Sequence, residues 1–292
     1  MTRSSTPDSK TLRLHAPAKV NLGLWVRRKR PDGYHDLETV FLPIPLCDTL
    51  DIRLHDGPDV LTCDDPDIPV NGENLVLQAI AALRHAWGTR APEQGFRIHL
   101  KKRIPACGGL GGGSSDCGAV LQGVPNWLGL PISHRRLAKV ALLLGSDVPL
   151  FLQPRLCVAR GRGERMRSLN WSLRGNMVLV LPDVRVSTPW AFQRVKPRGE
   201  GGGSLTRLLR PALAHQRGLP DGCRLNDFEP PVFSEYPILR EYQENLQRRG
   251  ARLAGMSGSG STLFGLFSEI GAARAARREI RARRTIAHLL TL

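Results

Sequence analysis

A run of glycines followed by hydroxyl and acidic side chains occupies the middle of the chain. Residues 105–116 read PACGGLGGGSSD, and five of the six positions from Gly108 to Gly113 are glycine. Ordering a glycine inside a helix or strand costs about 0.5–1 kcal/mol more than ordering an alanine. A run of glycines is therefore expected only where the backbone conformation or a close approach to a ligand requires it. Free backbone amides at the start of a helix bind anions, because the helix dipole also favours negative charge there. The run therefore predicts a phosphate-binding loop, with a tight surface turn as the alternative.

The order of residues in this loop excludes two common phosphate-binding motifs. A P-loop needs lysine after the second glycine of GxxxxGK[ST], but Ser114 follows Gly113. The dinucleotide fingerprint GxGxxG begins at Gly109 and Gly111, but its last position is again Ser114. A different kind of phosphate loop is required.

The loop is expected to join a strand to a helix. The alternating sequence FRIHLKKRI at 96–104 predicts a strand directly before it. Ser114, Ser115 or Asp116 could cap a helix that follows, and Pro125 is expected to end or kink that helix. Strand, glycine loop and helix N-terminus in this order would present free amides to an anion.

The rest of the chain mixes strand and helix patterns, which predicts an α+β fold. Helices are expected over 73–88, 133–145 and 237–250, with a last helix at 273–284 closing the chain. Strand patterns cover 12–26 (one bent strand or two short ones), 40–55 (strand, loop, strand) and 177–183. A second glycine loop, MSGSGS at 256–261, leads into another strand.

Length and composition limit the number of domains and the classes of protein that the chain can belong to. The 292 residues fit two domains, and no apolar run is long enough to span a membrane. The start of the chain lacks the apolar segment of a signal peptide, and a mobile tail is expected over residues 1–10. The six cysteines form no CxxC pair, which is typical of reduced thiols in a cytoplasmic protein.

The net charge of +16 leaves two classes of partner open, nucleic acids and anionic small molecules. The densest basic segment is ARAARREIRARR at 273–284, and at helical spacing four of its arginines form one stripe. We interpret this stripe as a solvated helix face. Its members are Arg274, Arg277, Arg278 and Arg281.

Three segments together resemble the GHMP kinases, a superfamily that includes galactokinase, homoserine kinase, mevalonate kinase and phosphomevalonate kinase. IPACGGLGGGSSD is similar to their phosphate loop, APAKVNLGLWV to their N-terminal motif and LAGMSGSGSTLFGLF to their C-terminal glycine motif. The three motifs have the family order and are spread over residues 16–267. The resemblance implies the GHMP kinase fold, with a ribosomal-S5-like N-terminal domain at 11–165 and a ferredoxin-like C-terminal domain at 166–292.

The resemblance also implies a reaction and roles for individual residues. It implies ATP and Mg²⁺ as cofactors, with Ser115 assisting the metal. It makes Asp147 the catalytic base and places Lys19 beside it, where an ammonium would keep the carboxylate charged. From the sequence alone, Asp147 could equally be a helix N-cap and Lys19 a strand-edge charge. The residues matched to ATP binding are Pro105, Gly108, Gly109, Leu110, Gly111, Gly112, Gly113, Ser114 and Ser115.

The segments PAKVNLGLWVRRKRPDGYHDLETVF and LGSDVPLFL resemble one branch of the superfamily more closely. This branch transfers phosphate to the 2-hydroxyl of a small-molecule cytidyl substrate, 4-diphosphocytidyl-2-C-methyl-D-erythritol, in the non-mevalonate isoprenoid pathway. Another small-molecule GHMP kinase and a basic nucleic-acid-binding protein are the alternatives. The branch implies a cytoplasmic monomer or weak homodimer that binds neither nucleic acid nor membranes. It matches Tyr34 and His35 to the cytosine, Asn21 to the methylerythritol, Lys102 and Phe192 to the base and sugar, and Thr188 to a substrate-domain motif.

Overall fold

The computed structural model describes residues 11–106, 108–171, 173–199, 201, 203–214, 219 and 223–292. The tail expected at residues 1–10 lies outside these residues. The chain forms two compact units that alternate along the sequence, so no single cut separates them. The predicted domain boundary at 165/166 stays a prediction. Unit 1 comprises Met1–Pro17, Cys47–Ala106 and Gly112–Gln153, and unit 2 comprises Ala18–Leu46, Cys107–Gly111 and Pro154–Leu292.

Two long strands, β1 (Leu12–Lys29) and β2 (His35–His55), each contribute to both units. The one-strand alternative for residues 12–26 is therefore confirmed. The strand–loop–strand prediction for 40–55 was wrong, because β2 is continuous through Pro43 and Pro45. Its first part pairs with β5 and its last part with β4, and both prolines fall between these two paired stretches. A proline there removes no hydrogen bond from either pairing.

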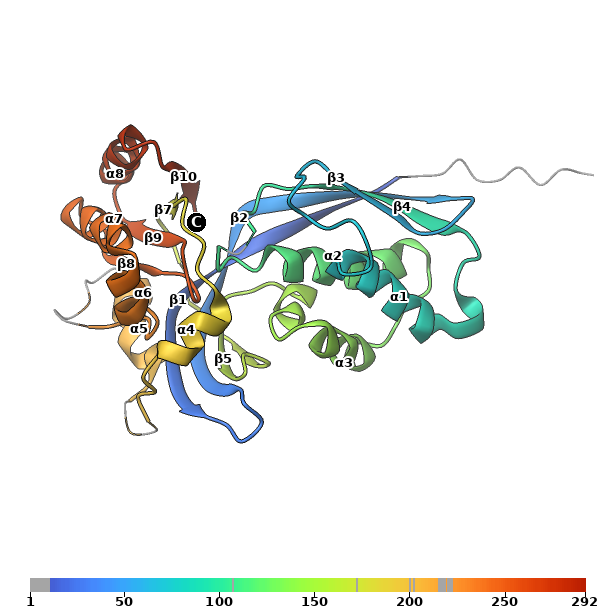
Figure 1. Ribbon diagram of the computed structural model, residues 1–292, viewed down its shortest axis with the longest axis horizontal. Helices are drawn as coiled ribbons and strands as arrows, with labels where there is room; N and C mark the ends of the chain where they lie inside the picture. The colour runs from blue at the N-terminus through green and yellow to red at the C-terminus, as the bar shows by residue number, and fades with distance from the viewer. Residues whose placement is uncertain are drawn as a thin grey trace, which may run out of the picture. The chain divides into compact units, whose positions relative to one another are not determined.

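Unit 1 packs three helices on one face of a sheet (Figure 1). The sheet contains the last part of β2 with β3 (Val60–Cys63) and β4 (Gly95–Lys101), and the helices are α1 (Leu75–Trp87), α2 (Gly112–Trp127) and α3 (His134–Leu144). Two short 3₁₀ helices complete it, η1 (Gly88–Arg90) and η2 (Val148–Leu152). The predicted ends of α1 at Gly88 and α3 at Gly145 are confirmed.

The helix after the glycine loop starts earlier than expected. α2 begins at Gly112, so Ser114, Ser115 and Asp116 lie inside its first turns, and the predicted cap at these residues was wrong. Pro125 also lies inside α2, which continues to Trp127. A proline at this position removes the hydrogen bond to the Leu121 carbonyl, and α2 ends soon after it, at Trp127. The predicted strand before the loop is confirmed by β4.

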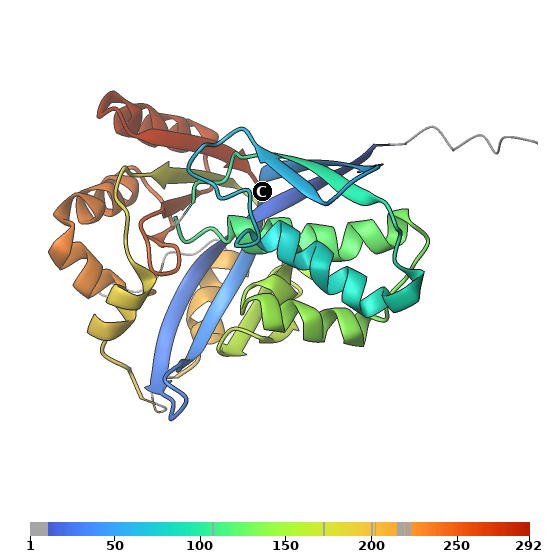
Figure 2. The ribbon, with the colours of Figure 1, turned by 45° about the vertical axis from the view of Figure 1, so that its right-hand side comes forward.

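Unit 2 contains an antiparallel sheet with strand order β10–β7–β9–β8. Its strands are β7 (Asn176–Leu181), β8 (Leu253–Met256), β9 (Leu263–Phe267) and β10 (Ile286–Thr291). Helices α7 (Pro237–Arg248) and α8 (Ile270–Ala282) cover one face of this sheet (Figure 2). With helices between β7 and β8 and between β9 and β10, the arrangement is ferredoxin-like, as expected. The arginine-rich helix does not close the chain, however, because β10 follows it and pairs with β7.

The remaining elements of unit 2 are two strands that precede β7 in the sequence and three helices between β7 and α7. They are β5 (Cys157–Gly161), β6 (Arg165–Ser168), α4 (Thr188–Arg194), α5 (Leu205–Ala214) and α6 (Glu229–Glu235). Both units thus mix helices and strands, which confirms the predicted α+β class. Within the described ranges, no helix combines the length and apolar composition needed to cross a bilayer.

Candidate active site

The glycine loop has the backbone conformation of an anion cradle. Gly109 and Gly111 have φ angles of +74° and +73°, and Leu110 lies between them. Alternation of left- and right-handed residues turns successive N–H groups toward one side, which forms a concave nest for anions. α2 then starts at Gly112 and carries no acidic residue in its first turn to oppose an anion. The loop therefore fits the phosphates of a nucleotide.

Within unit 2 the loop is held against the second glycine loop and β1. A Cβ atom on Gly109 would lie 2.3 Å from the carbonyl oxygen of Ser257, so only glycine fits there. The backbone N–H of Lys19 donates to the Leu110 carbonyl at 2.9 Å, and Lys19 Nζ donates to the Gly109 carbonyl at 2.9 Å. The Thr262 N–H contacts the Gly108 carbonyl from the second loop. These bonds fix the cradle from two sides.

Lys19 and Asn21 form a buried polar pair on β1. They are only 4% and 2% exposed, and Lys19 Nζ donates to Asn21 Oδ1 at 2.7 Å. Asn21 Nδ2 donates in turn to Thr39 Oγ1, which donates to the Gly23 carbonyl. The two side chains share one side of the strand, because residues two positions apart on an extended strand point the same way. The reading of Lys19 as an exposed strand-edge charge is excluded.

The first turn of α2 in unit 1 presents one serine and buries the next. Ser114 is half-buried, whereas the Ser115 hydroxyl is buried and donates to the Pro17 carbonyl at 2.7 Å. Binding of a metal by Ser115 would require that this bond break, and its role there stays a prediction. Magnesium at nucleotides needs few protein ligands, because phosphates and water supply most of them. In the described part of the chain, no three His, Cys, Asp or Glu side chains gather as a metal site.

Asp147 lies in unit 1 at the start of η2. It is half-buried at the N-cap position, but its side chain makes no capping hydrogen bond. A Cβ atom on Gly145 would lie 3.9 Å from Ser114 Oγ, so this segment runs beside the first turn of α2. The alternative role of Asp147 as a helix cap is therefore not realised. Lys19 belongs to unit 2, and its predicted pairing with Asp147 stays a prediction.

The two residues matched to cytosine have aromatic and cationic neighbours in unit 2. The His35 ring stacks on Phe192 with a centroid distance of 5.0 Å, and Phe192 meets Phe228 edge-on at 4.8 Å. Tyr34 is 51% exposed, and the Arg162 guanidinium lies 3.7 Å from its ring centroid. Burial and the nearby charge of Lys29 lower the pKa of His35. At neutral pH its ring is therefore neutral, with one donor and one acceptor nitrogen.

Thr188 and Lys102 occupy different surroundings. Thr188 begins α4, and its hydroxyl is 2.9 Å from Ser259 Oγ in the second glycine loop. Lys102 Nζ contacts Asp48 at 2.5 Å and Asp116 at 3.0 Å in the interior of unit 1. All three side chains of this ion triad are at least nine-tenths buried. A substrate contact by the Lys102 ammonium would compete with two carboxylates, so that role stays a prediction.

Comparison with known proteins identifies the family. Residues 74–154 match the family model described as GHMP kinases N terminal domain, and residues 203–284 match GHMP kinases C terminal. A 4-diphosphocytidyl-2-C-methyl-D-erythritol kinase of Geobacter sp. (strain M21) is 41% identical over 93% of this chain and 95% of its own length. The chain belongs to the GHMP kinase family. A relative of the same name from Salinibacter ruber (strain DSM 13855 / M31) is 38% identical over 94% of this chain and 96% of its own.

Solved structures of GHMP kinases have the same fold. A crystal structure of 4-(cytidine 5'-diphospho)-2C-methyl-D-erythritol kinase superposes with a TM-score of 0.80 and 37% identity, covering 96% of this chain and all of the other. Homoserine kinase from Cytophaga hutchinsonii gives a TM-score of 0.70 at 20% identity, covering 100% of this chain and 96% of its own, which supports the fold alone. Members of this family are kinases that use ATP, in agreement with the glycine loop.

The buried ion triad of this GHMP kinase gives unit 1 a pH dependence. Burial raises the pKa of the Asp116 carboxyl above its ordinary value, although Lys102 acts in the opposite direction. Its Oδ1 is buried and accepts no hydrogen bond from the described residues. A carboxyl whose pKa is raised on folding binds its proton more tightly in the folded state. The free energy of unfolding therefore falls as pH rises from the unfolded pKa to the folded one.

Asp116→Asn should remove this loss, because asparagine cannot ionise and can still accept from Lys102. The difference in melting temperature between variant and wild type should become more favourable to the variant from pH 5 to pH 8. Each 1 kcal/mol should appear as about 2–4 °C in a thermal denaturation scan. Exposed Asp56→Asn is the control and should leave this difference constant. If the melting temperature of the variant minus that of the wild type falls from pH 5 to pH 8, the assigned direction of the pKa shift is wrong.

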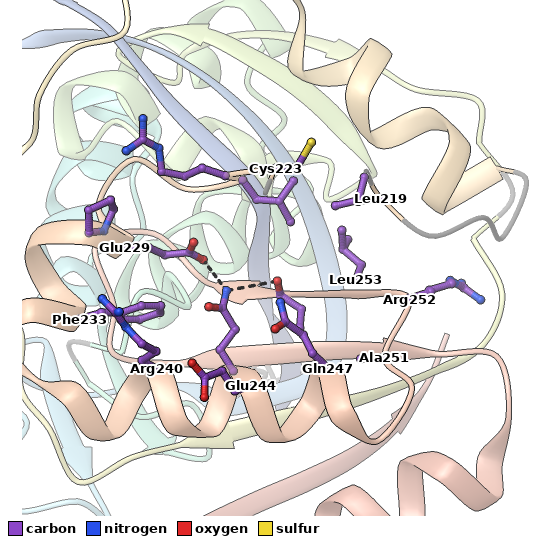
Figure 3. A pocket seen from close by; sticks show the side chains of 15 residues that line it. Leu219, Cys223, Glu229, Phe233, Arg240, Glu244, Gln247, Ala251, Arg252 and Leu253 are labelled. Carbon is purple, nitrogen blue, oxygen red and sulfur yellow. Dashed lines mark hydrogen bonds between the residues drawn. The ribbon is translucent and has the colours of Figure 1, made fainter. Parts of the chain in front are cut away.

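A separate hollow of about 800 Å³ lies in unit 2 beside α6, α7 and β8 (Figure 3). The Glu229 carboxyl lines it and accepts hydrogen bonds from Gln243 Nε2 and from the backbone N–H of Met256. Burial raises the pKa of Glu229 to about 7. None of the residues predicted for phosphoryl transfer lines this hollow. It is therefore distinct from the candidate active site.

Sequence reasoning missed several residues that shape the site. Ser257 was part of a recognised glycine motif, but nothing in the motif shows which atom its hydroxyl contacts. Arg162 lies in an arginine-rich turn and gave no signal of stacking on Tyr34. Asp48 and Asp116 are isolated acids whose meeting at Lys102 depends on the tertiary fold.

Proposed function

We propose that this GHMP kinase transfers a phosphoryl group from ATP to the 2-hydroxyl of 4-diphosphocytidyl-2-C-methyl-D-erythritol, a step of the non-mevalonate route to isoprenoid precursors. The observation that carries the proposal is similarity over nearly the whole chain to kinases named for this substrate, at 38–41% identity. The phosphate cradle and the His35–Phe192 pair support it, because they supply an anion site and an aromatic platform.

The glycine loop is proposed to hold the ATP phosphates. Backbone N–H groups from the loop and the first turn of α2 would bind phosphate oxygens, and Pro105 would fix the entry of the chain into the loop. Mg²⁺ is proposed as the second cofactor, where it would offset negative charge on the phosphates. The protein's own contribution is positioning, which dominates catalysis of phosphoryl transfer.

Asp147 is proposed to accept the proton of the substrate hydroxyl as general base. Its carboxylate makes no capping hydrogen bond to η2, so a role as helix cap does not compete with this one. Lys19 is proposed to keep Asp147 ionised and to offset charge that develops on the transferred group. Its burial, and its bonds to Asn21 and Gly109, hold the ammonium in one place.

Substrate contacts are proposed for six side chains. A base would stack on the aromatic side chains, and the neutral His35 ring would bind the polar edge of the base. Asn21 is proposed to lie near the methylerythritol group and Thr188 near the substrate through its place beside the second glycine loop. The six residues are Asn21, Tyr34, His35, Lys102, Thr188 and Phe192.

An assay of ADP release tests the proposed substrate. ADP production would be measured in a coupled assay with MgATP and, in turn, the cytidyl substrate, homoserine, galactose and mevalonate. Rapid turnover only with the cytidyl compound is expected. Turnover of another alcohol instead would favour a different GHMP kinase and overturn the substrate assignment.

His35→Ala should raise KM for the cytidyl substrate by about tenfold or more, equivalent to about 1.4 kcal/mol. Loss of stacking alone is worth about 1–3 kcal/mol per base, and loss of an edge contact adds to it. KM for ATP should change much less, because other residues bind its phosphates. Steady-state kinetics with each substrate varied in turn measure both values.

The control for this variant is His85→Ala, which removes an exposed histidine from α1. A uridine analogue should be a poor substrate of the wild type and less disfavoured by His35→Ala. Equal losses for both substrates would indicate misfolding near residue 35. A loss confined to ATP would mean that the two nucleotide sites are assigned the wrong way round.

The proposed setting is a cytoplasmic monomer or weak homodimer without nucleic-acid or membrane partners. The basic stripe on α8 agrees with a solvated helix face, because three of its four arginines are exposed. The fourth, Arg277, donates a hydrogen bond to the Ala287 carbonyl. Glu279 on the same helix pairs with Arg249, which reduces the local positive charge.

A further inference from the structure

The Ser257 hydroxyl joins the second glycine loop to the phosphate loop. Its Oγ donates to the Gly109 carbonyl at 2.9 Å and accepts from the Asn21 N–H at 3.1 Å. Ser257 is completely buried. The same Gly109 carbonyl also accepts from Lys19 Nζ. One oxygen of the phosphate loop is therefore bound by two donors that come from two distant parts of unit 2.

Fixing this carbonyl fixes the next amide. In a trans peptide the C=O and N–H groups point in opposite directions across one plane. The two donors bind the Gly109 oxygen on one side, so the Leu110 N–H must point away from Ser257 and Lys19. Leu110 lies between the two positive-φ glycines, in the centre of the anion cradle. The direction of the Leu110 N–H is thus determined by contacts with residues outside the loop.

Ser257 is itself held in place. Its N–H donates to the Thr262 carbonyl at 2.8 Å, and its own carbonyl accepts from the Gly260 N–H at 3.0 Å. The carbonyls on either side of it, those of Met256 and Gly258, both accept from Asn226 Nδ2 at 2.7 Å. A hydroxyl on such a constrained backbone has little freedom to leave Gly109.

We propose that Ser257 is a positioning residue for the nucleotide: its hydroxyl orients the Gly109–Leu110 peptide so that the Leu110 N–H binds a phosphate of ATP. The inference rests on the proposed function in taking MgATP as the nucleotide. Loss of the hydroxyl leaves the Gly109 carbonyl with Lys19 alone, and the peptide can then rotate. In the variant, binding of phosphate would also have to order this peptide, which is already ordered in the wild type. The affinity for phosphate would therefore fall.

Ser257→Ala should raise the Kd for MgATP about tenfold, as expected when a buried hydrogen bond to the cradle is lost. The Kd is measured by calorimetric titration with MgATP and no second substrate. Ser257→Thr keeps the hydroxyl and should bind MgATP within about twofold of the wild type. If Ser257→Ala does not fold, Ser257→Cys, which fills a similar volume with a weak hydrogen-bonding group, takes its place with the same expectation.

The matched control is Ser261→Ala in the same loop. The Ser261 hydroxyl is also buried but donates to the Val184 carbonyl and not to the phosphate loop. It should lower the melting temperature without raising the Kd for MgATP. An unchanged Kd in Ser257→Ala, an equal rise in Ser261→Ala, or a failure of Ser257→Thr to restore binding would each overturn the inference. The proposed function fails separately, if the wild type does not phosphorylate the cytidyl substrate.

Discussion

Asp147→Asn should lower kcat by about 100-fold or more, in line with the usual contribution of a general base. The amide has nearly the same shape as the carboxylate but cannot accept the proton of the substrate hydroxyl. Because the Asp147 side chain makes no capping hydrogen bond, its replacement should leave the start of η2 intact. KM values for both substrates should stay close to those of the wild type. Steady-state kinetics and a melting curve together measure these effects.

The control is Asp183→Asn, which changes an exposed carboxylate after β7 and should leave kcat unchanged. A kcat near the wild-type value in Asp147→Asn would remove this residue from the role of base. A second test combines it with Lys19→Met. If both residues serve the same chemical step, the double variant should lose little more than the worse single variant.

Local chemistry made much of the site predictable. The phosphate loop could be predicted because bare backbone before a helix has few other uses, and its two positive-φ glycines agree with that reasoning. Helix α1 could be predicted from its apolar spacing and from Gly88 at its end. Lys19 and Asn21 lie two positions apart on an extended strand, and this spacing is enough to place both side chains on one side.

Contacts between distant segments were beyond such reasoning. β2 is one continuous strand through two prolines and pairs with β1, β4 and β5, which the sequence of residues 40–55 alone does not show. The Ser257 hydroxyl meets the Gly109 carbonyl across 148 positions of sequence, and no local pattern encodes that distance. Lys102 was matched to the substrate, yet its ammonium lies between two buried carboxylates. A charged side chain reveals its partner only when the fold brings the two together.

The glycine loop itself gives the other large effect. Gly111→Val should abolish binding of MgATP, because Gly111 has a φ of +73° that a β-branched residue rarely adopts. Valine would drive the backbone out of the alternating conformation, and the amides would no longer point toward one anion. Saturating MgATP, at about 100 times its Kd, should raise the wild-type melting temperature by roughly 5–10 °C. This shift should vanish in the variant, along with measurable kinase activity.

A loss of this kind must be separated from the strain that valine brings to any such position. Gly129, in the turn after α2, has a φ of +65° and open space around its missing Cβ, so Gly129→Val imposes comparable backbone strain away from the cradle. We expect both variants to melt earlier than the wild type in the absence of nucleotide, because both strain the backbone, but only Gly129→Val should keep the full shift with MgATP. Full protection of Gly111→Val by MgATP would show that the phosphates bind elsewhere. Loss of the shift in both variants would assign the effect to strain and not to the loss of anion-binding amides.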